Sequence, residues 1–523
     1  MLKRKLAEVS KKWKLSNSYL LGIMLVAIVV LLILSTKKEG MHVDEYYTYG
    51  LAIHVADGEI TPVPECGIPL TPSDIFDTYF YAETFSLKNV WLNQSVDVHP
   101  PLYYLIFHIW GLLTHNFLGL KTGILLNVLL HIVNIGLIFL IFKELLSKES
   151  MILVGSGMYA FNPIILGNVL YIRMYALFST FILLLILLLL REWMKEKTVR
   201  HFYFKLGGIS ILGALTHYYF LIYLFFSCWV WGMRLLIKHK GREVLRFAGT
   251  MLLSGGICVA IFPYMLQQIF TGNRGQESIN KLLDSSWLFN IRFFGGTFDK
   301  ISGGFSLAIL SVAVLMLLYK IGAEGFKIAD NRAWFYIILM PGIFYVLLVS
   351  KMAVMLATRY IAPLYGSWII VIMLLIKGIM DYIDKSSLRS IGAICIVALL
   401  LNAEWKMYTW PELYPEAKDA VEVAKEYGAH NECVYVYETL YRSMPTYQEF
   451  MQYPKITFIP EDNFDLLLQE HYTSQHNIVI YFDKEIGQEQ KEKQMKRLIE
   501  FSPNMENYQK LYEYAYNEAY YLE

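Results

Sequence analysis

The sequence predicts a mainly α-helical membrane protein, a polytopic bundle of about 11–13 crossings that is followed by a small C-terminal α/β domain. Three observations predict this class. Hydrophobic residues make up 56% of the 523 residues and charged residues only 17%, whereas ordinary soluble proteins have roughly 45–50% and about 25%. Apolar runs long enough to span a bilayer core of ~30 Å recur, for example at 18–36 and 174–190. Beyond residue 404, helix-like stretches alternate with short strand-like runs.

The first apolar run is expected to remain in the protein as a helix. It is longer than a signal-peptide core, and no A-x-A cleavage site follows it. If every apolar segment crosses, the two ends of the chain cannot both be placed as their charges demand. Segment 100–118 can instead lie along the outer surface, and 203–216 is short for a crossing. The expected segments are 18–36, 100–118, 121–143, 152–171, 174–190, 203–216, 217–237, 245–270, 303–319, 333–350, 354–376 and 388–403.

The distribution of charge predicts the orientation. Residues 1–17 are strongly basic, so the positive-inside rule places this N-terminus in the cytoplasm. The first helix then delivers residues 37–99 to the outer face of the cell membrane as a long outer loop. Cytoplasmic turns are marked by further basic clusters at 191–200, 238–246, 320–332 and 377–389. We therefore expect a membrane domain over 18–403 with a second outer loop over 272–302, and an extracytoplasmic domain over 404–523.

Several classes of partner and site have no support in the sequence. The formal net charge is +1, and no basic tract is dense enough to indicate nucleic-acid binding. The C-terminal domain has no glycine-rich loop that would indicate a bound nucleotide. The cysteines lack the spacing of a disulfide framework or a metal site; they are Cys66, Cys228, Cys258, Cys395 and Cys433.

Two adjacent carboxylates, Asp44 and Glu45, lie in the motif MHVDEYYTYG soon after the first helix. Acids on an outer loop are most often simply solvated. These two, however, lie where a lipid-linked substrate would present its headgroup. Tyr46 and the tyrosines after it suit stacking against a sugar. An Asp-Glu pair can also hold a divalent cation.

Two histidines near helix ends each allow two interpretations. The outer loop ends in DVHPPLYYLIFHIW, where Asp97 and His99 precede two prolines. Proline suits the first turn of a helix, so these residues can be a cap and a rigid helix start, or they can position a substrate. His217 in LTHYYFLIYLFF can bind a headgroup or an acceptor, but an interfacial belt of tyrosines is the commoner explanation for such a pattern.

Two arginines lie at the ends of apolar segments: Arg173 in YIRMYAL and Arg359 in LATRYIAPLY. An arginine within a membrane run costs several kcal/mol unless it is paired or hydrated, so each is a functional candidate. The competing interpretation is an arginine that extends to the interface. Both map to the outer face, and Tyr175 and Tyr360 follow them. Because guanidinium groups bind phosphate oxygens with fork geometry, we predict that the two clamp a polyprenyl phosphate.

Taken together, these motifs resemble the GT-C-fold glycosyltransferases. A basic N-terminus, one helix and an outer loop that begins with Asp-Glu are similar to the start of those enzymes. The order DVHPPLYY, IRMYAL, THYYFL and TRYIAPLY resembles the glycosyltransferase 39 group. That group includes protein O-mannosyltransferases, lipid A aminoarabinose transferases and related bacterial enzymes. The resemblance covers residues 15–405 and does not extend to the C-terminal domain.

The resemblance implies a membrane glycosyltransferase that takes a hexosyl or pentosyl unit from a polyprenyl-phosphate carrier. It also implies that the anomeric centre is inverted on the outer side of the membrane. Related families mostly need no metal, so no cofactor is expected to be obligatory. The family's loop carboxylate, HPPL element, R-x-Y arginine and late Arg-Tyr pair correspond to Asp44 (with Glu45 beside it), residues 99–102, Arg173, and Arg359 with Tyr360.

The predicted reaction is a single displacement. An acceptor hydroxyl attacks C1 of the sugar, and the polyprenyl phosphate leaves. A hydroxyl needs a base within hydrogen-bond reach; Asp44 is the predicted base, and Glu45 positions the acceptor or a cation. Arg173 and Arg359 stabilise the charge on the leaving phosphate. The expected acceptor is an envelope glycopolymer, a lipid or a protein.

Two other classes of protein compete with an enzyme. A polytopic transporter or flippase of lipid-linked substrates would have charged residues near the midplane and broken helices in matching halves. The sequence shows no internal repeat, and its polar residues cluster at outer helix ends. A membrane-anchored scaffold built around the C-terminal domain would not require arginines at helix ends. The enzyme is therefore the main hypothesis.

Overall fold

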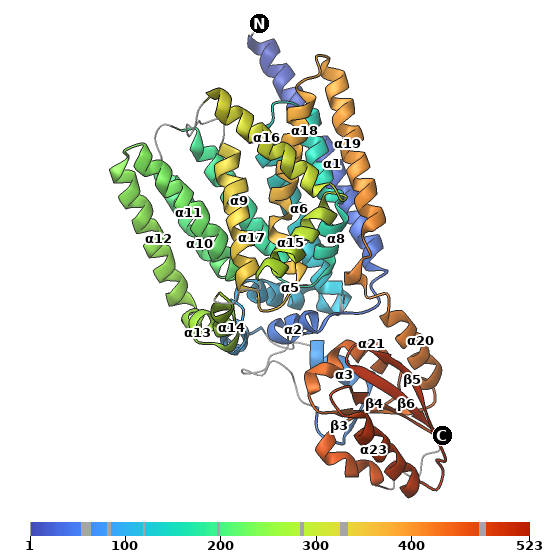
Figure 1. Ribbon diagram of the computed structural model, residues 1–523. Helices are drawn as coiled ribbons and strands as arrows, with labels where there is room; N and C mark the ends of the chain where they lie inside the picture. Colours follow the sequence, from blue (N-terminus) through green and yellow to red (C-terminus); the bar gives the residue numbers. More distant parts are fainter. Residues whose placement is uncertain are drawn as a thin grey trace. The chain divides into compact units, whose positions relative to one another are not determined.

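The chain forms two compact units in the computed structural model (Figure 1). We call the first the helical unit; it comprises Met1–Ile33, Val98–Tyr103 and Ile124–Trp410. We call the second the sheet unit; it comprises Leu34–Asp97, Tyr104–Gly123 and Pro411–Glu523. The structure describes residues 2–53, 64–80, 85–118, 121–195, 199–282, 287–324, 333–469 and 477–523. Parts of the predicted outer loops (54–63, 81–84, 283–286) and of the predicted basic clusters (196–198, 325–332) lie outside them.

The helical unit is a bundle in which long apolar helices lie side by side (Figure 1). Helices suit a bilayer because each one satisfies its own backbone hydrogen bonds without water. The helices are α1 (Leu2–Ser35), α6 (Thr122–Leu145), α7 (Glu149–Phe161), α8 (Pro163–Leu170), α9 (Tyr175–Trp193), α10 (Arg200–Ala214), α11 (Tyr219–Ile237), α12 (Gly241–Ile261), α13 (Tyr264–Phe270), α14 (Asn273–Lys281), α15 (Trp287–Ile301), α16 (Ser306–Glu324), η3 (Phe335–Leu339), α17 (Met340–Met352), η4 (Thr358–Tyr360), η5 (Ala362–Leu364), α18 (Tyr365–Met380) and α19 (Ser386–Met407).

Eight helices in the described part of the chain are long and apolar enough to cross a membrane. The number is nine if α7 and α8, which are bent by 48° at a short break, form one span. The chain is thus a multi-pass membrane protein, but this count is below the predicted 11–13. Each predicted segment contains a helix, although 354–376 is α-helical only from Tyr365 onward. α10 has 15 residues and rises only about 22 Å, and the apolar part of α5 (Leu102–Leu118) is shorter still.

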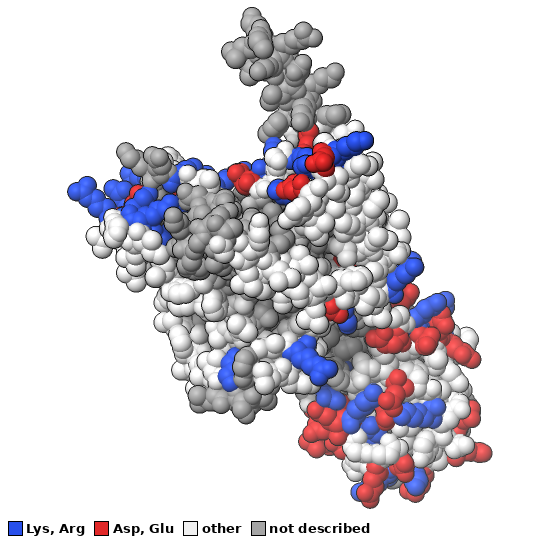
Figure 2. All heavy atoms as spheres, turned by 45° about the horizontal axis from the view of Figure 1, so that its top comes forward, with Lys and Arg blue, Asp and Glu red and all other residues white. Residues whose placement is uncertain are grey.

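Charge is distributed unevenly over the helical unit. Figure 2 shows a broad surface without Lys, Arg, Asp or Glu between charged ends of this unit. Lysines and arginines gather where α9 is followed by α10 and where α11 is followed by α12. Such an uncharged band with basic connections at one end matches a bilayer-spanning body. The cytoplasmic placement of those connections, and of the N-terminus, stays a prediction.

The sheet unit is built on a six-stranded sheet of order β1-β3-β2-β4-β6-β5. β2 pairs in parallel with β3 and β4, whereas the other pairs are antiparallel. Val434, Ile480 and Phe482 are fully buried in its core. This confirms the predicted small C-terminal α/β domain. Its elements are β2 (Glu432–Tyr437), β3 (Ile456–Pro460), β4 (Ile478–Asp483), β5 (Tyr508–Tyr514), β6 (Asn517–Leu522), α20 (Ala417–Gly428), α21 (Tyr447–Phe450), α23 (Gln488–Phe501), η6 (Pro411–Leu413), η7 (Leu440–Thr446) and η8 (Glu461–Leu468).

The predicted outer loop over 37–99 contributes to the sheet unit. It contains α2 (Val43–Ala52), α3 (Pro72–Phe80) and α4 (Leu87–Val96), so much of it is helical. Its strand β1 (Pro69–Leu70) pairs with β3 through Leu70 and Ile456. The segment that follows α1 and the segment that follows α19 therefore fold together in the sheet unit. The compact units have different boundaries from the predicted division near residue 404.

Candidate functional site

Arg173 lies in the turn between the short helix α8 and the helix α9. α8 begins at Pro163, and Asn162 caps it by accepting hydrogen bonds from the N–H groups of Ile164 and Ile165 at 3.2 and 3.3 Å. After Leu170 the backbone becomes extended at Tyr171, and α9 starts only at Tyr175. The intervening turn holds Arg173 between the two helices α8 and α9 instead of within one.

His99 and Arg173 meet inside the helical unit. Nη2 of Arg173 lies 3.4 Å from Nε2 and 3.5 Å from Nδ1 of His99. Arg173 is only 4% exposed. The backbone near His99 is fixed by the N–H of Leu102, which donates to the carbonyl of Leu215 at 2.9 Å. The HPPL segment is therefore bound to the connection that leads to His217.

His217 lies in the connection between α10 and α11 and is 6% exposed. Its ring stacks on Phe178 at 5.1 Å and lies 5.9 Å from the His99 ring. Nδ1 accepts a hydrogen bond from the N–H of Tyr219 at 3.0 Å, so a neutral ring carries its proton on Nε2. That buried Nε2 has no hydrogen-bond partner among the described residues. It is thus a donor available to a ligand.

Arg359 lies in η4, between α17 and α18, and is half-buried. Its guanidinium carbon is 5.7 Å from the centre of the Tyr171 ring and 5.8 Å from that of Tyr360. Tyr171 in turn stacks on Tyr175 at 6.4 Å. The Tyr345 hydroxyl donates to the carbonyl of Tyr360 at 2.6 Å. These contacts place Arg359 beside the turn that carries Arg173.

The helical unit thus brings together all six predicted residues that belong to it: His99, Arg173, Tyr175, His217, Arg359 and Tyr360. We call His99, Arg173, His217 and Arg359 the Arg-His cluster. The cluster contains two guanidinium groups and a buried N–H donor, and tyrosine rings surround it. Such a group of donors can bind an anion with several oxygens, because guanidinium groups bind phosphate through paired hydrogen bonds. Partial burial strengthens such contacts relative to those in water.

Glu45 in the sheet unit is engaged by the protein itself. Its side chain is 0% exposed and lies 2.9 Å from the ammonium of Lys38. It also accepts a hydrogen bond from the N–H of His42 at 2.8 Å, while His42 Nδ1 accepts one from the N–H of Asp44 at 3.1 Å. This is a capping box at the start of α2. Lys38 and the cap therefore hold both oxygens of Glu45.

Asp44 is the accessible carboxylate of the pair. Its side chain is 24% exposed and lies 3.5 Å from Nδ1 of His42. Tyr46 is buried and packs against Phe80 and Tyr447. The described residues contain no group of three or more His, Cys, Asp or Glu that could hold a metal ion. A divalent cation at this pair would have to displace the Lys38 ammonium from Glu45.

Asp97 ends α4 as its C-cap and is half-buried. Its N–H donates to the carbonyl of Asn93 at 3.3 Å. Asp97, like Asp44 and Glu45, belongs to the sheet unit, whereas His99 belongs to the helical unit. The convergence of Asp44 with Arg173 and Arg359 therefore stays a prediction.

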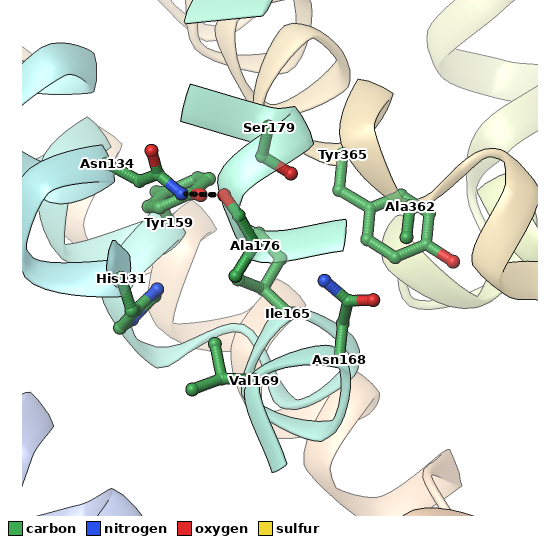
Figure 3. A pocket seen from close by; sticks show the side chains of 10 residues that line it. All are labelled: His131, Asn134, Tyr159, Ile165, Asn168, Val169, Ala176, Ser179, Ala362 and Tyr365. Carbon is green, nitrogen blue, oxygen red and sulfur yellow. Dashed lines mark hydrogen bonds between the residues drawn. The ribbon is translucent and has the colours of Figure 1, made fainter. Parts of the chain in front are cut away.

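A hollow inside the helical unit is lined by His131, Asn134, Asn168, Ser179 and Tyr365, among others (Figure 3). The volume that the centre of a water-sized sphere can occupy is about 10 Å³. The hollow therefore holds about one water molecule. Figure 3 shows Asn134 bonded across it to the carbonyl of Ala176. The hollow is too small for a sugar or a phosphate, so it is not the substrate site.

Sequence reasoning missed several residues of the site. Tyr171 contacts Arg359, and its place in the pattern Y-x-R-x-Y around Arg173 was a usable signal. Tyr219 contacts both His217 and Tyr360. The partnership of Lys38 with Glu45 had no comparable signal, because nothing in the sequence shows that the lysine is buried.

The comparisons with known proteins agree on the fold. No protein-family model matches the chain, and no curated protein matches it. The chain is similar to ArnT from Cupriavidus metallidurans bound to undecaprenyl phosphate, with a TM-score of 0.56 and 11% identity over 97% of this chain and 98% of that chain. It is also similar to ArnT from Cupriavidus metallidurans in the apo state, with a TM-score of 0.53 and 10% identity over 96% of this chain and 98% of that chain. This likeness confirms the predicted GT-C-type fold; membership of the glycosyltransferase 39 group stays a prediction.

Proposed function

We propose that this chain, which has the fold of ArnT, is a membrane glycosyltransferase that transfers a hexosyl or pentosyl unit from a polyprenyl-phosphate carrier to a hydroxyl acceptor. The observation that carries the proposal is the Arg-His cluster at the junction of several helices of the helical unit. Guanidinium groups bind phosphate oxygens through paired hydrogen bonds, so a lipid phosphate suits a cluster that contains two arginines. The likeness to ArnT with bound undecaprenyl phosphate supports the same ligand chemistry.

In the proposed reaction, the acceptor oxygen forms a bond to C1 of the sugar as the bond from C1 to the phosphate oxygen breaks. The acceptor proton passes to the carboxylate of Asp44, and the polyprenyl phosphate leaves with the bonding electrons. Asp44 fits a base better than Glu45 does, because Lys38 neutralises Glu45 and Asp44 is accessible. Glu45 then acts by fixing the start of α2, which orients Asp44.

The Arg-His cluster would stabilise the leaving group. As the C1–O bond breaks, negative charge grows on the phosphate, and groups aimed at that charge lower the barrier. Arg173 and Arg359 supply positive charge. The Nε2–H of His217 supplies a neutral donor, since its Nδ1 is already engaged by Tyr219. Tyr175 and Tyr360 form the aromatic sides of the site, and His99 orients Arg173.

The remaining parts of the proposal concern place and partners. The protein resides in the cell membrane with the N-terminus in the cytoplasm, and its active site and C-terminal domain face outward. The acceptor is an envelope glycopolymer, a lipid or a protein. No metal is proposed to be obligatory, and the Lys38 ammonium beside Glu45 supports this, since a divalent cation at Asp44 and Glu45 would have to displace it.

The variant Asp44→Asn tests the base. We expect transfer from a radiolabelled polyprenyl-phosphate sugar, measured in reconstituted membranes against a panel of sugars, to fall by about 10²–10⁴-fold. Asparagine has nearly the same shape but cannot take the proton. Asp74→Asn is the matched control, since Asp74 is an exposed acid of the same predicted outer loop and accepts hydrogen bonds from Thr71 at the start of α3.

Near-normal transfer by Asp44→Asn would remove Asp44 from the mechanism. Movement of the labelled lipid across the bilayer without transfer by the unaltered protein would favour a flippase instead. Loss of activity in both Asp44→Asn and Asp74→Asn would indicate damage to the fold and not to the base.

A further inference from the structure

Asn127 is a fully buried amide in the second turn of the apolar helix α6. All its hydrogen-bonding groups face polar atoms of neighbouring segments. Its amide nitrogen donates to the carbonyl of Val169 at 3.2 Å and to the carbonyl of Tyr171 at 2.9 Å. Its amide oxygen accepts a hydrogen bond from the hydroxyl of Tyr103 at 3.1 Å. One side chain thus connects three separate parts of the helical unit.

The two carbonyls that Asn127 binds belong to the helix break before Arg173. The last carbonyls of a helix have no partner within it, and in a membrane no bulk water replaces that partner. α8 ends at Leu170, so Val169 and Tyr171 lie at such an end. The Tyr171 carbonyl also accepts a hydrogen bond from the N–H of Arg173 at 2.8 Å. Asn127 therefore stabilises the backbone conformation that places Arg173 in its turn.

The same amide also binds next to the segment that carries His99. Tyr103 directly follows the HPPL segment (residues 99–102) and, like that segment, belongs to the helical unit. Its hydroxyl bond to Asn127 fixes that segment against the Tyr171 turn, where Nη2 of Arg173 meets the His99 ring. The Tyr171 ring also contacts the guanidinium of Arg359. The hydrogen bonds of Asn127 thus hold the segments that carry His99 and Arg173. They also hold Tyr171, whose ring contacts Arg359.

We propose that Asn127 is a positioning residue for the polyprenyl-phosphate donor: it sets the spacing of Arg173, His99 and Arg359 without touching the lipid phosphate. This inference rests on the proposed function, because it assigns a ligand to the Arg-His cluster. Small displacements of binding groups far from the reacting atoms can cost about 10²-fold in rate. Replacing Asn127 should therefore weaken donor binding as well as lower the stability of the protein.

The test measures the Kd of the purified full-length protein for undecaprenyl phosphate, well below the unfolding temperature of each variant. We expect Asn127→Leu to raise the Kd by about tenfold or more. The matched control is Asn134→Leu, since Asn134 is a buried amide on the same helix that bonds to Ala176 and Thr180 in α9. This control should lower the melting temperature comparably but leave the Kd within about twofold.

Tyr103→Phe keeps the test decisive if Asn127→Leu does not fold. It removes only the hydroxyl bond, so it should raise the Kd by a smaller factor. Combined with Asn127→Leu it should add little, because Asn127→Leu has already removed the amide oxygen to which the Tyr103 hydroxyl donates.

The outcomes separate the two proposals. Two results would contradict both the proposed function and this inference. One is that the unaltered protein does not bind undecaprenyl phosphate, and the other is that Arg173→Gln binds it as tightly as the unaltered protein does. If Arg173→Gln weakens binding while Asn127→Leu and Tyr103→Phe behave like Asn134→Leu, only the positioning role is overturned.

Discussion

Glu449 of α21 is a carboxyl group buried in the sheet unit, only 1% exposed. Neither of its oxygens has a hydrogen-bond partner among the described residues. Burial raises its pKa to about 8 from an ordinary 4.5. The titratable groups that interact with its charge are Tyr46, Cys433, Tyr453, Tyr481, Tyr512 and Tyr514. Glu449 is therefore mostly protonated in the folded protein at pH 7.

This pKa shift makes the stability of the sheet unit depend on pH. Because the folded-state pKa is raised, the stabilising contribution of the neutral group is complete below about pH 4.5 and is lost as the pH rises to about 8. Glu449→Gln cannot ionise. We expect it to be more stable than the unaltered protein at pH 8, by a few kcal/mol at most, and to show a flatter dependence of the unfolding midpoint on pH between 5 and 8.5.

Thermal unfolding followed by circular dichroism across that pH range would measure the effect. Glu426→Gln serves as the control, since Glu426 is exposed on α20. An unchanged pH dependence in Glu449→Gln would show that this carboxyl is ionised in the folded protein.

At the scale of elements, the start of α2 depends on a buried ion pair. The side chains of Lys38 and Glu45 are 5% and 0% exposed, and Lys38 also donates to the carbonyl of Glu412 at 2.8 Å. Removing one partner of a buried pair leaves the other charge uncompensated. The two partners differ, because a lysine stem can turn its ammonium toward water, whereas the short side chain of Glu45 is held by the α2 cap.

We therefore expect Lys38→Met to lower the free energy of unfolding by about 3–5 kcal/mol and Glu45→Gln by only about 1–3 kcal/mol. Chemical denaturation in detergent, followed through the fluorescence of the sheet unit, would measure both. Lys418→Met, which removes half of an exposed pair on α20, should change the free energy by about 0–1 kcal/mol. Equal losses in Lys38→Met and Lys418→Met would contradict a structural role for the buried pair.

The long helices of the bundle were predictable because their apolar runs have the length of a bilayer core, and hydrophobicity over that length alone favours a membrane helix. The short helices α2, α3 and α4 were not, since helices of this length depend on packing against other segments. β1, a strand of two residues, is defined only by its partner β3. Strand-like runs such as ITFIP were predictable from their β-branched and aromatic residues.

The candidate site was predictable in its composition but not in its connections. Charged residues in apolar runs are rare enough to identify Arg173 and Arg359 from the sequence. Asn127 is equally visible within an apolar run, yet its role depends on carbonyls released by the break at Tyr171. That break follows from backbone geometry that no local sequence pattern specified.

At the scale of the whole molecule, the chain has the fold of ArnT along 97% of its length. The helical unit carries the Arg-His cluster, and the sheet unit carries Asp44. The account requires both to act on one substrate: the cluster binds the donor phosphate and Asp44 takes the acceptor proton. Either group alone could bind but could not complete the displacement.

The most direct test is an experimental structure of the full-length protein with undecaprenyl phosphate. The account predicts phosphate density within hydrogen-bond distance of Arg173 and Arg359, about 2.7–3.2 Å from their nitrogens, with the Asp44 carboxylate facing the same space. Phosphate density bound elsewhere, or an Asp44 carboxylate separated from the phosphate by other parts of the protein, would contradict the account.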